Sequence, residues 1–110
     1  MVIQISESTP YTIATINVTE ANLECSEAFK LQMMRLIDDG HKKVIVSFEK
    51  VSYVDSSFLG ALVASLKYAI NKHADITLTH LNKDVANLLQ LIRLDKVFTI
   101  YPTNALAMQQ

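Results

Sequence analysis

Hydrophobic and polar residues alternate over Val2–Ile5 and again over Tyr11–Val18. A period of two residues is typical of β-strands with one buried face, so we expect two short strands joined by a polar turn. The segment Lys43–Phe48, KVIVSF, is instead almost continuously apolar. Such a run predicts a central strand that is buried on both faces. Two further strands are expected over Asp75–Leu81 and Lys96–Tyr101.

Between these strands the apolar residues recur at helical spacing. The first predicted helix is capped by Asn22 or Thr19, ends at Asp38–Gly40 and has an apolar face made of Phe29, Met33, Leu36 and Ile37. The second begins near Ser57 and should turn four side chains toward the sheet: Leu59, Leu62, Leu66 and Ile70. The third follows Asn82 with Val85, Leu88, Leu89 and Ile92, and Thr103 caps a final turn.

The order of these elements is β-β-α-β-α-β-α-β-α. Strands that alternate with single helices form parallel pairs through crossover connections, with the helices packed on the sheet. We therefore expect an α/β fold with a mixed central sheet of about five strands and helices mainly on one face. The first one or two strands should lie at an edge of this sheet, and Lys43–Phe48 should lie at its centre.

The segment Val51–Gly60, VSYVDSSFLG, places an acid and two hydroxyls where a strand meets a helix. Asp and Ser at such a position cap the helix by accepting hydrogen bonds from its first free N–H groups. One cap needs only one of Asp55, Ser56 and Ser57. A hydroxyl there also lies in a field that favours anions, so a phosphate could be carried at this point. From the residues alone, capping and regulation remain equally good explanations.

Composition narrows the classes of function. The chain has 110 residues, a net charge of −1 and one cysteine, which fits a single domain over residues 1–110 in the reducing cytoplasm. We expect no nucleic-acid partner, because there is no basic field, and no direct membrane insertion, because no apolar run approaches about 20 residues. The sequence shows no phosphate-binding glycine loop and no metal-ligand spacing, so we expect no metal and no cofactor.

Several segments together resemble the STAS-domain family, in particular the single-domain bacterial anti-sigma-factor antagonists. The family has D-S-[ST]-G-L-G after an apolar strand end, and this chain has DSSFLG at Asp55–Gly60. Thr19–Asn22, TEAN, stands where the family has G-E-[LI]-D. Thr77–Leu88 and Leu91–Phe98 match the family's later segments in order and spacing.

The resemblance implies that Ser56 is the phosphorylated residue, with Ser57 as a lesser candidate. It also implies a surface that binds partner proteins, for which we expect Glu20, Asn22, Asp55, Ser56, Ser57, Phe58, Gly60 and Ala61. Two residues depart from the family pattern. Phe58 replaces a glycine, and it either forms an exposed anchor for a partner or tucks into the core. Asn22 replaces an aspartate, which removes a negative charge near a phosphate.

The function implied is a phosphorylation-controlled binding switch in a bacterial partner-switching pathway, with no catalytic residues. The expected partners are a serine kinase or anti-sigma factor of the ATP-binding histidine-kinase-like fold and a PP2C-type serine phosphatase. The alternative is a STAS accessory subunit of an ABC-type membrane transport complex without a phosphorylation cycle. An enzyme is disfavoured because no histidine lies near the serines in sequence.

Overall fold

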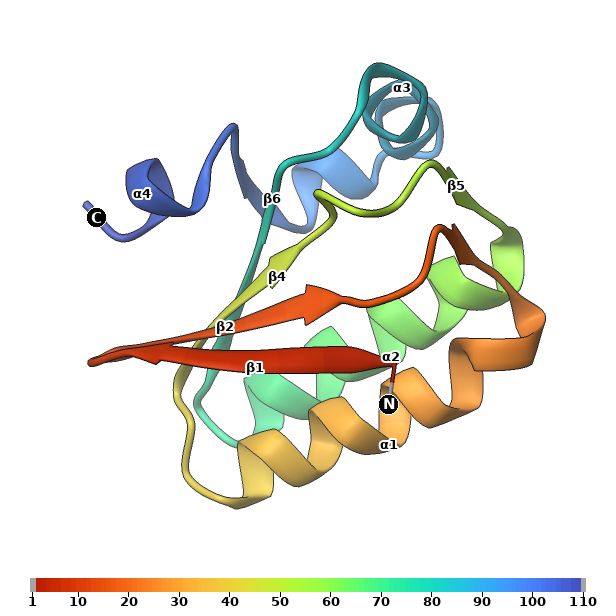
Figure 1. The fold of residues 1–110 in the computed structure, drawn as a ribbon. Coiled ribbons are helices and arrows are strands. Elements are labelled where there is room, and N and C mark those ends of the chain that lie inside the picture. The colour runs from red at the N-terminus through yellow and green to blue at the C-terminus, as the bar shows by residue number, and fades with distance from the viewer. Residues whose placement is uncertain (1, 110) are drawn as a thin grey trace.

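The computed structural model describes residues 2–109, and its elements follow the predicted order with three short additions (Figure 1). The strands are β1 Ile3–Ser8, β2 Tyr11–Ile16, β3 Glu20–Ala21, β4 Lys43–Ser47, β5 Tyr53–Val54, β6 Asp75–Thr79 and β7 Thr99–Tyr101. The helices are α1 Leu23–Asp38, α2 Ser56–Asn71, α3 Lys83–Leu91, the 3-10 turn η1 Leu94–Lys96 and α4 Asn104–Ala107.

The main sheet has five strands in the order β1-β2-β4-β6-β7. β1 runs antiparallel to β2, and every other neighbouring pair is parallel. The predicted mixed sheet is therefore confirmed, with β1 at an edge and β4 at the centre between two parallel neighbours. Val44 to Phe48 are all buried, as a strand covered on both faces requires.

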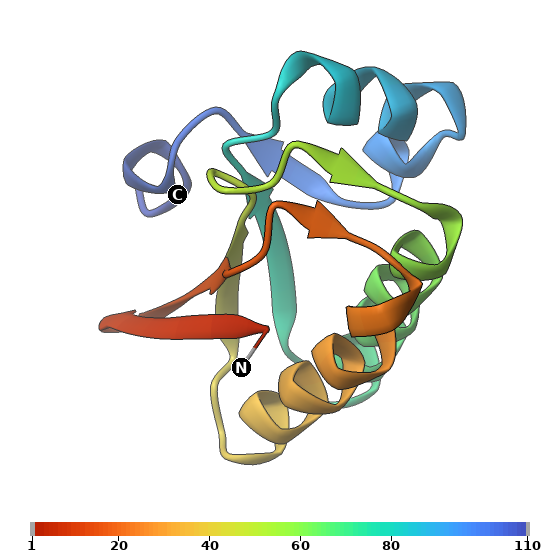
Figure 2. The same ribbon diagram turned by 45° about the vertical axis from the view of Figure 1, so that its right-hand side comes forward.

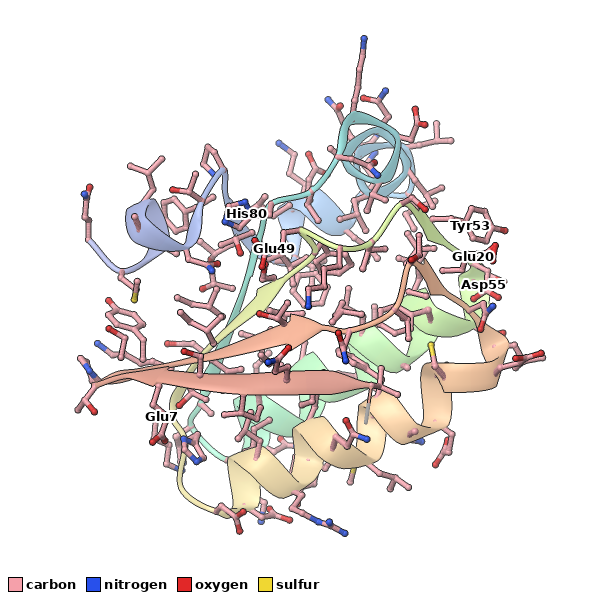
Figure 3. All side chains as sticks on the ribbon, in the orientation of Figure 1. Glu7, Glu20, Glu49, Tyr53, Asp55 and His80 are labelled. Atoms are coloured by element: carbon pink, nitrogen blue, oxygen red, sulfur yellow. The ribbon has the colours of Figure 1, made fainter. Side chains whose placement is uncertain are left out.

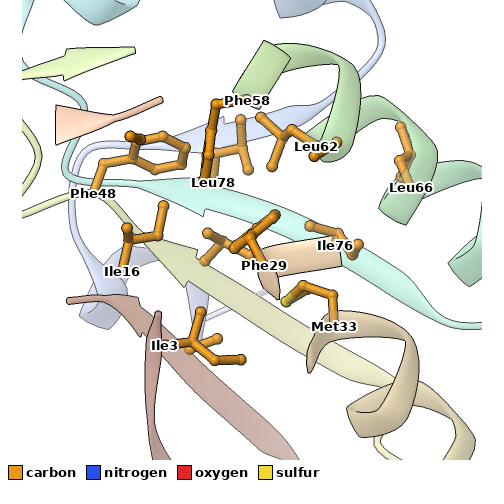
Figure 4. Packing of buried hydrophobic residues seen from close by; sticks show 14 of the residues in the cluster. Ile3, Ile16, Phe29, Met33, Phe48, Phe58, Leu62, Leu66, Ile76 and Leu78 are labelled. Atoms are coloured by element: carbon orange, nitrogen blue, oxygen red, sulfur yellow. The ribbon is translucent and has the colours of Figure 1, made fainter. Parts of the chain in front are cut away.

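The core lies between the sheet and helices α1 and α2, which cover one face (Figure 2). The rings of Phe29 on α1 and Phe58 on α2 are tilted against each other with centroids 4.6 Å apart. Met33 and Leu62 are fully buried beside them (Figure 4). The short α4 lies on the opposite side of the sheet, where Ala107 is buried. The predicted arrangement, with helices mainly on one face, is thus confirmed.

Three of the differences from the predicted elements have a clear physical cause. The strand expected to reach Leu81 ends at Thr79, because His80 adopts a left-handed conformation with φ 57° and turns the chain. The first half of Lys96–Tyr101 is not extended, because the N–H groups of Val97 and Phe98 both bond back to the carbonyl of Leu94 and close a 3-10 turn.

The third error concerns Ile70, which was expected to face the sheet but is 60% exposed. Leu59, Leu62 and Leu66 are buried as predicted. On a helical projection Ile70 lies at the margin of this buried face, and it belongs to the last turn of α2. The spacing identified the face correctly but extended it one turn too far.

This contrast gives a stability test. Leu66→Ala should lower the free energy of unfolding by about 2–5 kcal/mol, because it leaves a cavity under α2. Ile70→Ala removes a comparable side chain from an exposed site and should change stability by no more than about 0.5 kcal/mol. Urea denaturation followed by circular dichroism measures both. Similar costs for the two variants would show that the buried face of α2 is misassigned.

Candidate functional site

The N-terminus of α2 is capped by one residue, Asp55, whose backbone is extended with φ −108° and ψ 177°. Its Oδ1 atom accepts a hydrogen bond from the N–H of Phe58 at 2.9 Å. Its Oδ2 atom accepts another from the N–H of Leu23, also at 2.9 Å. Leu23 is the first residue of α1. A single carboxylate therefore satisfies free donors at the start of both helices, and its negative charge is favourable at both positive helix ends.

A small second sheet brings the two helix starts together. Strand β3 pairs in parallel with β5, so that Glu20 lies opposite Tyr53 and Ala21 opposite Val54. The N–H of Asp55 continues this pairing by donating to the carbonyl of Ala21 at 3.1 Å. Figure 3 shows Glu20, Tyr53 and Asp55 gathered at the end of the molecule where α2 begins. The sequence did not predict these strands, because two residues are too few to show a period.

Asn22, which stands in place of the family's aspartate, caps α1. Its Oδ1 atom accepts from the N–H of Glu24 at 3.1 Å. The predicted cap is therefore confirmed, and it is made without a charge. Asn22 and Asp55 thus lie at adjacent helix ends, so the structure brings the two predicted loop segments into one site.

Ser56 and Ser57 form the first turn of α2 and are not needed for its cap. Ser56 is exposed and Ser57 is half-buried. Neither hydroxyl makes a hydrogen bond to any of residues 2–109. Since Asp55 alone makes the side-chain cap, capping does not require either hydroxyl.

Phe58 does not belong to the surface. Its side chain is fully buried against Phe29, so the expectation of an exposed aromatic anchor at this position is wrong and the core placement is correct. Helical spacing explains the result, because Phe58 falls on the same face as the buried Leu62. Ala61 is also buried and contributes little side chain to a surface.

Gly60 is exposed one turn after Ser56. A Cβ atom built there would meet nothing within 4 Å. No close approach within the chain therefore requires a glycine at this position.

Sequence reasoning missed Tyr53, whose side chain is 54% exposed. It precedes Asp55 by two residues, and in an extended strand residues two apart point to the same side. The intervening Val54 is buried. The sequence does contain a pattern that indicates this exposure. Tyr53 alternates with the apolar Val54 just before Asp55 and Ser56, so one of the two faces solvent when the other is buried.

The other reactive side chains make hydrogen-bonding contacts within the chain. The Cys25 thiol donates to the carbonyl of Asn22 at 3.4 Å. His41 Nδ1 lies 2.6 Å from the hydroxyl of Thr12, and His80 Nε2 accepts from the N–H of Asn104 at 3.3 Å. Within residues 2–109, His, Cys, Asp and Glu form no group of three that could hold a metal ion. No helix within residues 2–109 is both long enough and apolar enough to span a membrane.

The five-stranded mixed sheet, the helices on one face and the Asp-Ser-Ser turn at the start of α2 define a STAS domain. The STAS domain family model matches residues 19–107, and the chain belongs to this family. A protein of Thermotoga maritima named "Putative anti-sigma factor antagonist" is 29% identical over 92 residues, which is 83% of this chain and 81% of that protein.

Solved structures agree with this assignment. The crystal structure of a Thermotoga maritima protein with the same description matches with a TM-score of 0.87 and 25% identity, covering 97% of this chain and 92% of the other. The anti-sigma factor antagonist SpoIIAA in its unphosphorylated form has the same fold, with a TM-score of 0.72 and 15% identity over 94% of this chain and 90% of that one. The phosphorylated form from Bacillus gives a TM-score of 0.72 and 16% identity over 97% and 96%.

The double cap gives the second prediction. Asp55→Ala removes the acceptor for the N–H of Leu23 in α1 and the acceptor for the N–H of Phe58 in α2. Asn22→Ala removes only the acceptor for the N–H of Glu24 in α1. We expect Asn22→Ala to lower the free energy of unfolding by about 1 kcal/mol and Asp55→Ala to lower it by at least about 1 kcal/mol more. Thermal and urea unfolding measure the difference. Equal losses would show that the bond to Leu23 contributes nothing to stability.

Proposed function

We propose that this chain is a phosphorylation-controlled binding switch in which the state of Ser56 decides whether a partner protein binds. The unmodified form binds a serine kinase or anti-sigma factor of the ATP-binding histidine-kinase-like fold. Transfer of a phosphate to Ser56 releases that partner, and a PP2C-type serine phosphatase restores the binding form. The chain itself acts as a single STAS domain over residues 1–110, as a binding protein without catalytic residues or a cofactor.

The observation that carries this proposal is the free, exposed hydroxyl of Ser56 beside a cap that does not use it. Asp55 already satisfies the donors of both helices. A kinase can therefore modify Ser56 without breaking any contact that holds α2. The proposed switch then needs no change of fold, because only the surface around Ser56 changes.

Charge explains how such a change would release a partner. A phosphate carries about −1.5 to −2 charges at neutral pH and three acceptor oxygens. It would stand next to the carboxylate of Asp55, close to Glu20 on the neighbouring strand. The first N–H groups of α2 favour an anion there, whereas a partner that fits a small neutral hydroxyl would have to bury the charge unpaired. That penalty amounts to several kcal/mol.

The relatives support the same proposal. SpoIIAA has been solved in unphosphorylated and phosphorylated forms, and this chain matches both with the same TM-score of 0.72. A phosphate is thus compatible with the fold that this chain shares. The Thermotoga relative described as an anti-sigma factor antagonist supports the choice of partner class.

The surface that the partner contacts, called here the switch surface, is proposed to combine two neighbouring loops with the exposed side of the start of α2, as far as Gly60. Phe58 takes part only through its backbone, and Ala61 lies at its margin. The residues that present side chains or open backbone to the partner are Glu20, Asn22, Asp55, Ser56, Ser57 and Gly60.

The third prediction tests the switch. Ser56→Ala should bind the cognate kinase as tightly as the unmodified protein, and Ser56→Asp should bind at least about a hundredfold more weakly, which corresponds to about 2.7 kcal/mol. Ser57→Ala should change the affinity for the kinase much less than Ser56→Asp does. Isothermal titration calorimetry without ATP gives the three affinities, and circular dichroism confirms that each variant is folded.

Ser57→Asp is the matched control, because it adds the same charge one residue away at a half-buried position. Intact-mass analysis after incubation with kinase and ATP should show one added phosphate on the natural chain and none on Ser56→Ala. Equal binding by Ser56→Ala and Ser56→Asp would refute the switch and favour the alternative, an accessory subunit of an ABC-type transport complex.

The fourth prediction concerns Gly60. Gly60→Ala should raise the free energy of unfolding by about 1 kcal/mol, because alanine is the better helix residue and the added methyl meets nothing. The same methyl should weaken kinase binding about tenfold if the partner's backbone lies against α2. Unfolding and calorimetry on one preparation separate the effects. A more stable variant with unchanged affinity would place Gly60 outside the switch surface.

A further inference from the structure

A groove lies between β5 and α3, and two of its lining residues, Tyr53 and Val54, directly precede Asp55 of the switch surface. Its volume is about 220 Å³, and it is lined by Ser52, Tyr53, Val54, Asp84, Val85 and Leu88. A cavity of about 150 Å³ admits benzene, so the groove can accept one aromatic or large aliphatic side chain. Its lining is largely apolar, with one carboxylate at the start of α3.

We infer that this groove, with Tyr53 as its wall, is a second contact for the same partner kinase, and that it takes an apolar side chain flanked by a lysine or arginine. The inference rests on the proposed function, because it concerns the partner of that site. It goes further in assigning partner choice to Tyr53 and the groove, independently of the phosphate on Ser56.

The walls of the groove are held in place before any partner arrives. Asn82 caps α3 by accepting from the N–H of Val85 at 2.8 Å. Its Nδ2 atom donates to the carbonyls of Val51 and Ser52, each at 3.2 Å. One amide therefore ties the start of α3 to the chain that enters β5. A contact formed on such a preorganised surface loses little conformational entropy on binding.

Continuity with Ser56 identifies the occupant. Tyr53 and Asp55 lie on one side of an extended segment, and residues two apart there are separated by about 7 Å. A protein large enough to bring its active site to Ser56 must therefore cover Tyr53 as well. Tyrosine is among the residues that most often dominate binding energy at interfaces. Tyr53 thus provides the exposed aromatic anchor that Phe58 does not.

The apolar surface also extends along α3. Leu88 and Leu91 are three residues apart and share one side of the helix, and Leu91 is 78% exposed. At the other end of this side lies the carboxylate of Asp84, and Glu20 stands opposite Tyr53 across the β3–β5 pair. The acidic groups at both margins favour a partner residue with a basic neighbour, and they steer it by complementary charge.

The fifth prediction tests this contact. Tyr53→Ala should weaken binding of the kinase at least tenfold, whereas Ile70→Ala, which removes another exposed apolar side chain at the far end of α2, should change affinity less than twofold. Asp84→Asn should slow association several-fold and reduce its salt dependence. Asp75→Asn makes the same change at the start of β6 and should leave association unaltered.

The probes are the serine kinases of the anti-sigma type encoded in the same genome, purified and titrated one by one by calorimetry, with stopped-flow kinetics for the charge variants. Tyr53→Ala should weaken binding by the same factor in the Ser56→Ala and Ser56→Asp backgrounds. Unfolding curves for each variant exclude loss of fold as the cause.

The outcomes separate the two proposals. If Ser56→Asp weakens binding and Tyr53→Ala does not, the switch stands and the groove contact is wrong. If Tyr53→Ala weakens binding and Ser56→Asp does not, the groove contact stands and the switch is wrong. If none of the kinases binds the natural chain, both are overturned.

Discussion

The carboxylate of Asp55 accepts one backbone N–H from α2 and one from α1, and the geometry of the whole site depends on this pair of bonds. Each oxygen satisfies a donor that a helix start would otherwise leave free. The parallel β3–β5 pair and the core contact between Phe29 and Phe58 bring the helix starts within reach of one side chain. The core thus positions the helix ends, and Asp55 fixes them where Ser56 reaches the surface.

The division of work between neighbouring residues follows from this arrangement. Asp55 stabilises the fold, and the exposed hydroxyl of Ser56 stays outside the cap. If the serine were the cap, a phosphate on it would alter the helix start and a partner would meet a changed fold. With the cap one residue earlier, the phosphate proposed for Ser56 would change charge and shape at the surface only.

The sequence predicts burial and capping correctly where they depend on the local spacing of apolar and polar residues. The burial of Val44 to Phe48, the buried face of α2 through Leu66 and the cap by Asn22 all follow from spacing and side-chain chemistry. The bond between Asp55 and Leu23 could not be predicted, because it joins residues 32 apart through strands of two residues. The burial of Phe58 and the exposure of Tyr53 could have been predicted, because Phe58 lies at helical spacing from the buried Leu62 and Tyr53 alternates with the buried Val54.

Around the site, exposed and buried residues alternate along the same short elements. Tyr53, Ser56 and Gly60 face solvent, while the interleaved Val54, Phe58 and Leu62 form the core. Substitutions at exposed positions usually change stability by less than about 0.5 kcal/mol. Gene duplication could therefore yield copies of this domain that diverge in partner while keeping an identical core. Within one cell, several such copies could each bind a different partner without cross-binding, because a few surface side chains on a common fold would distinguish them.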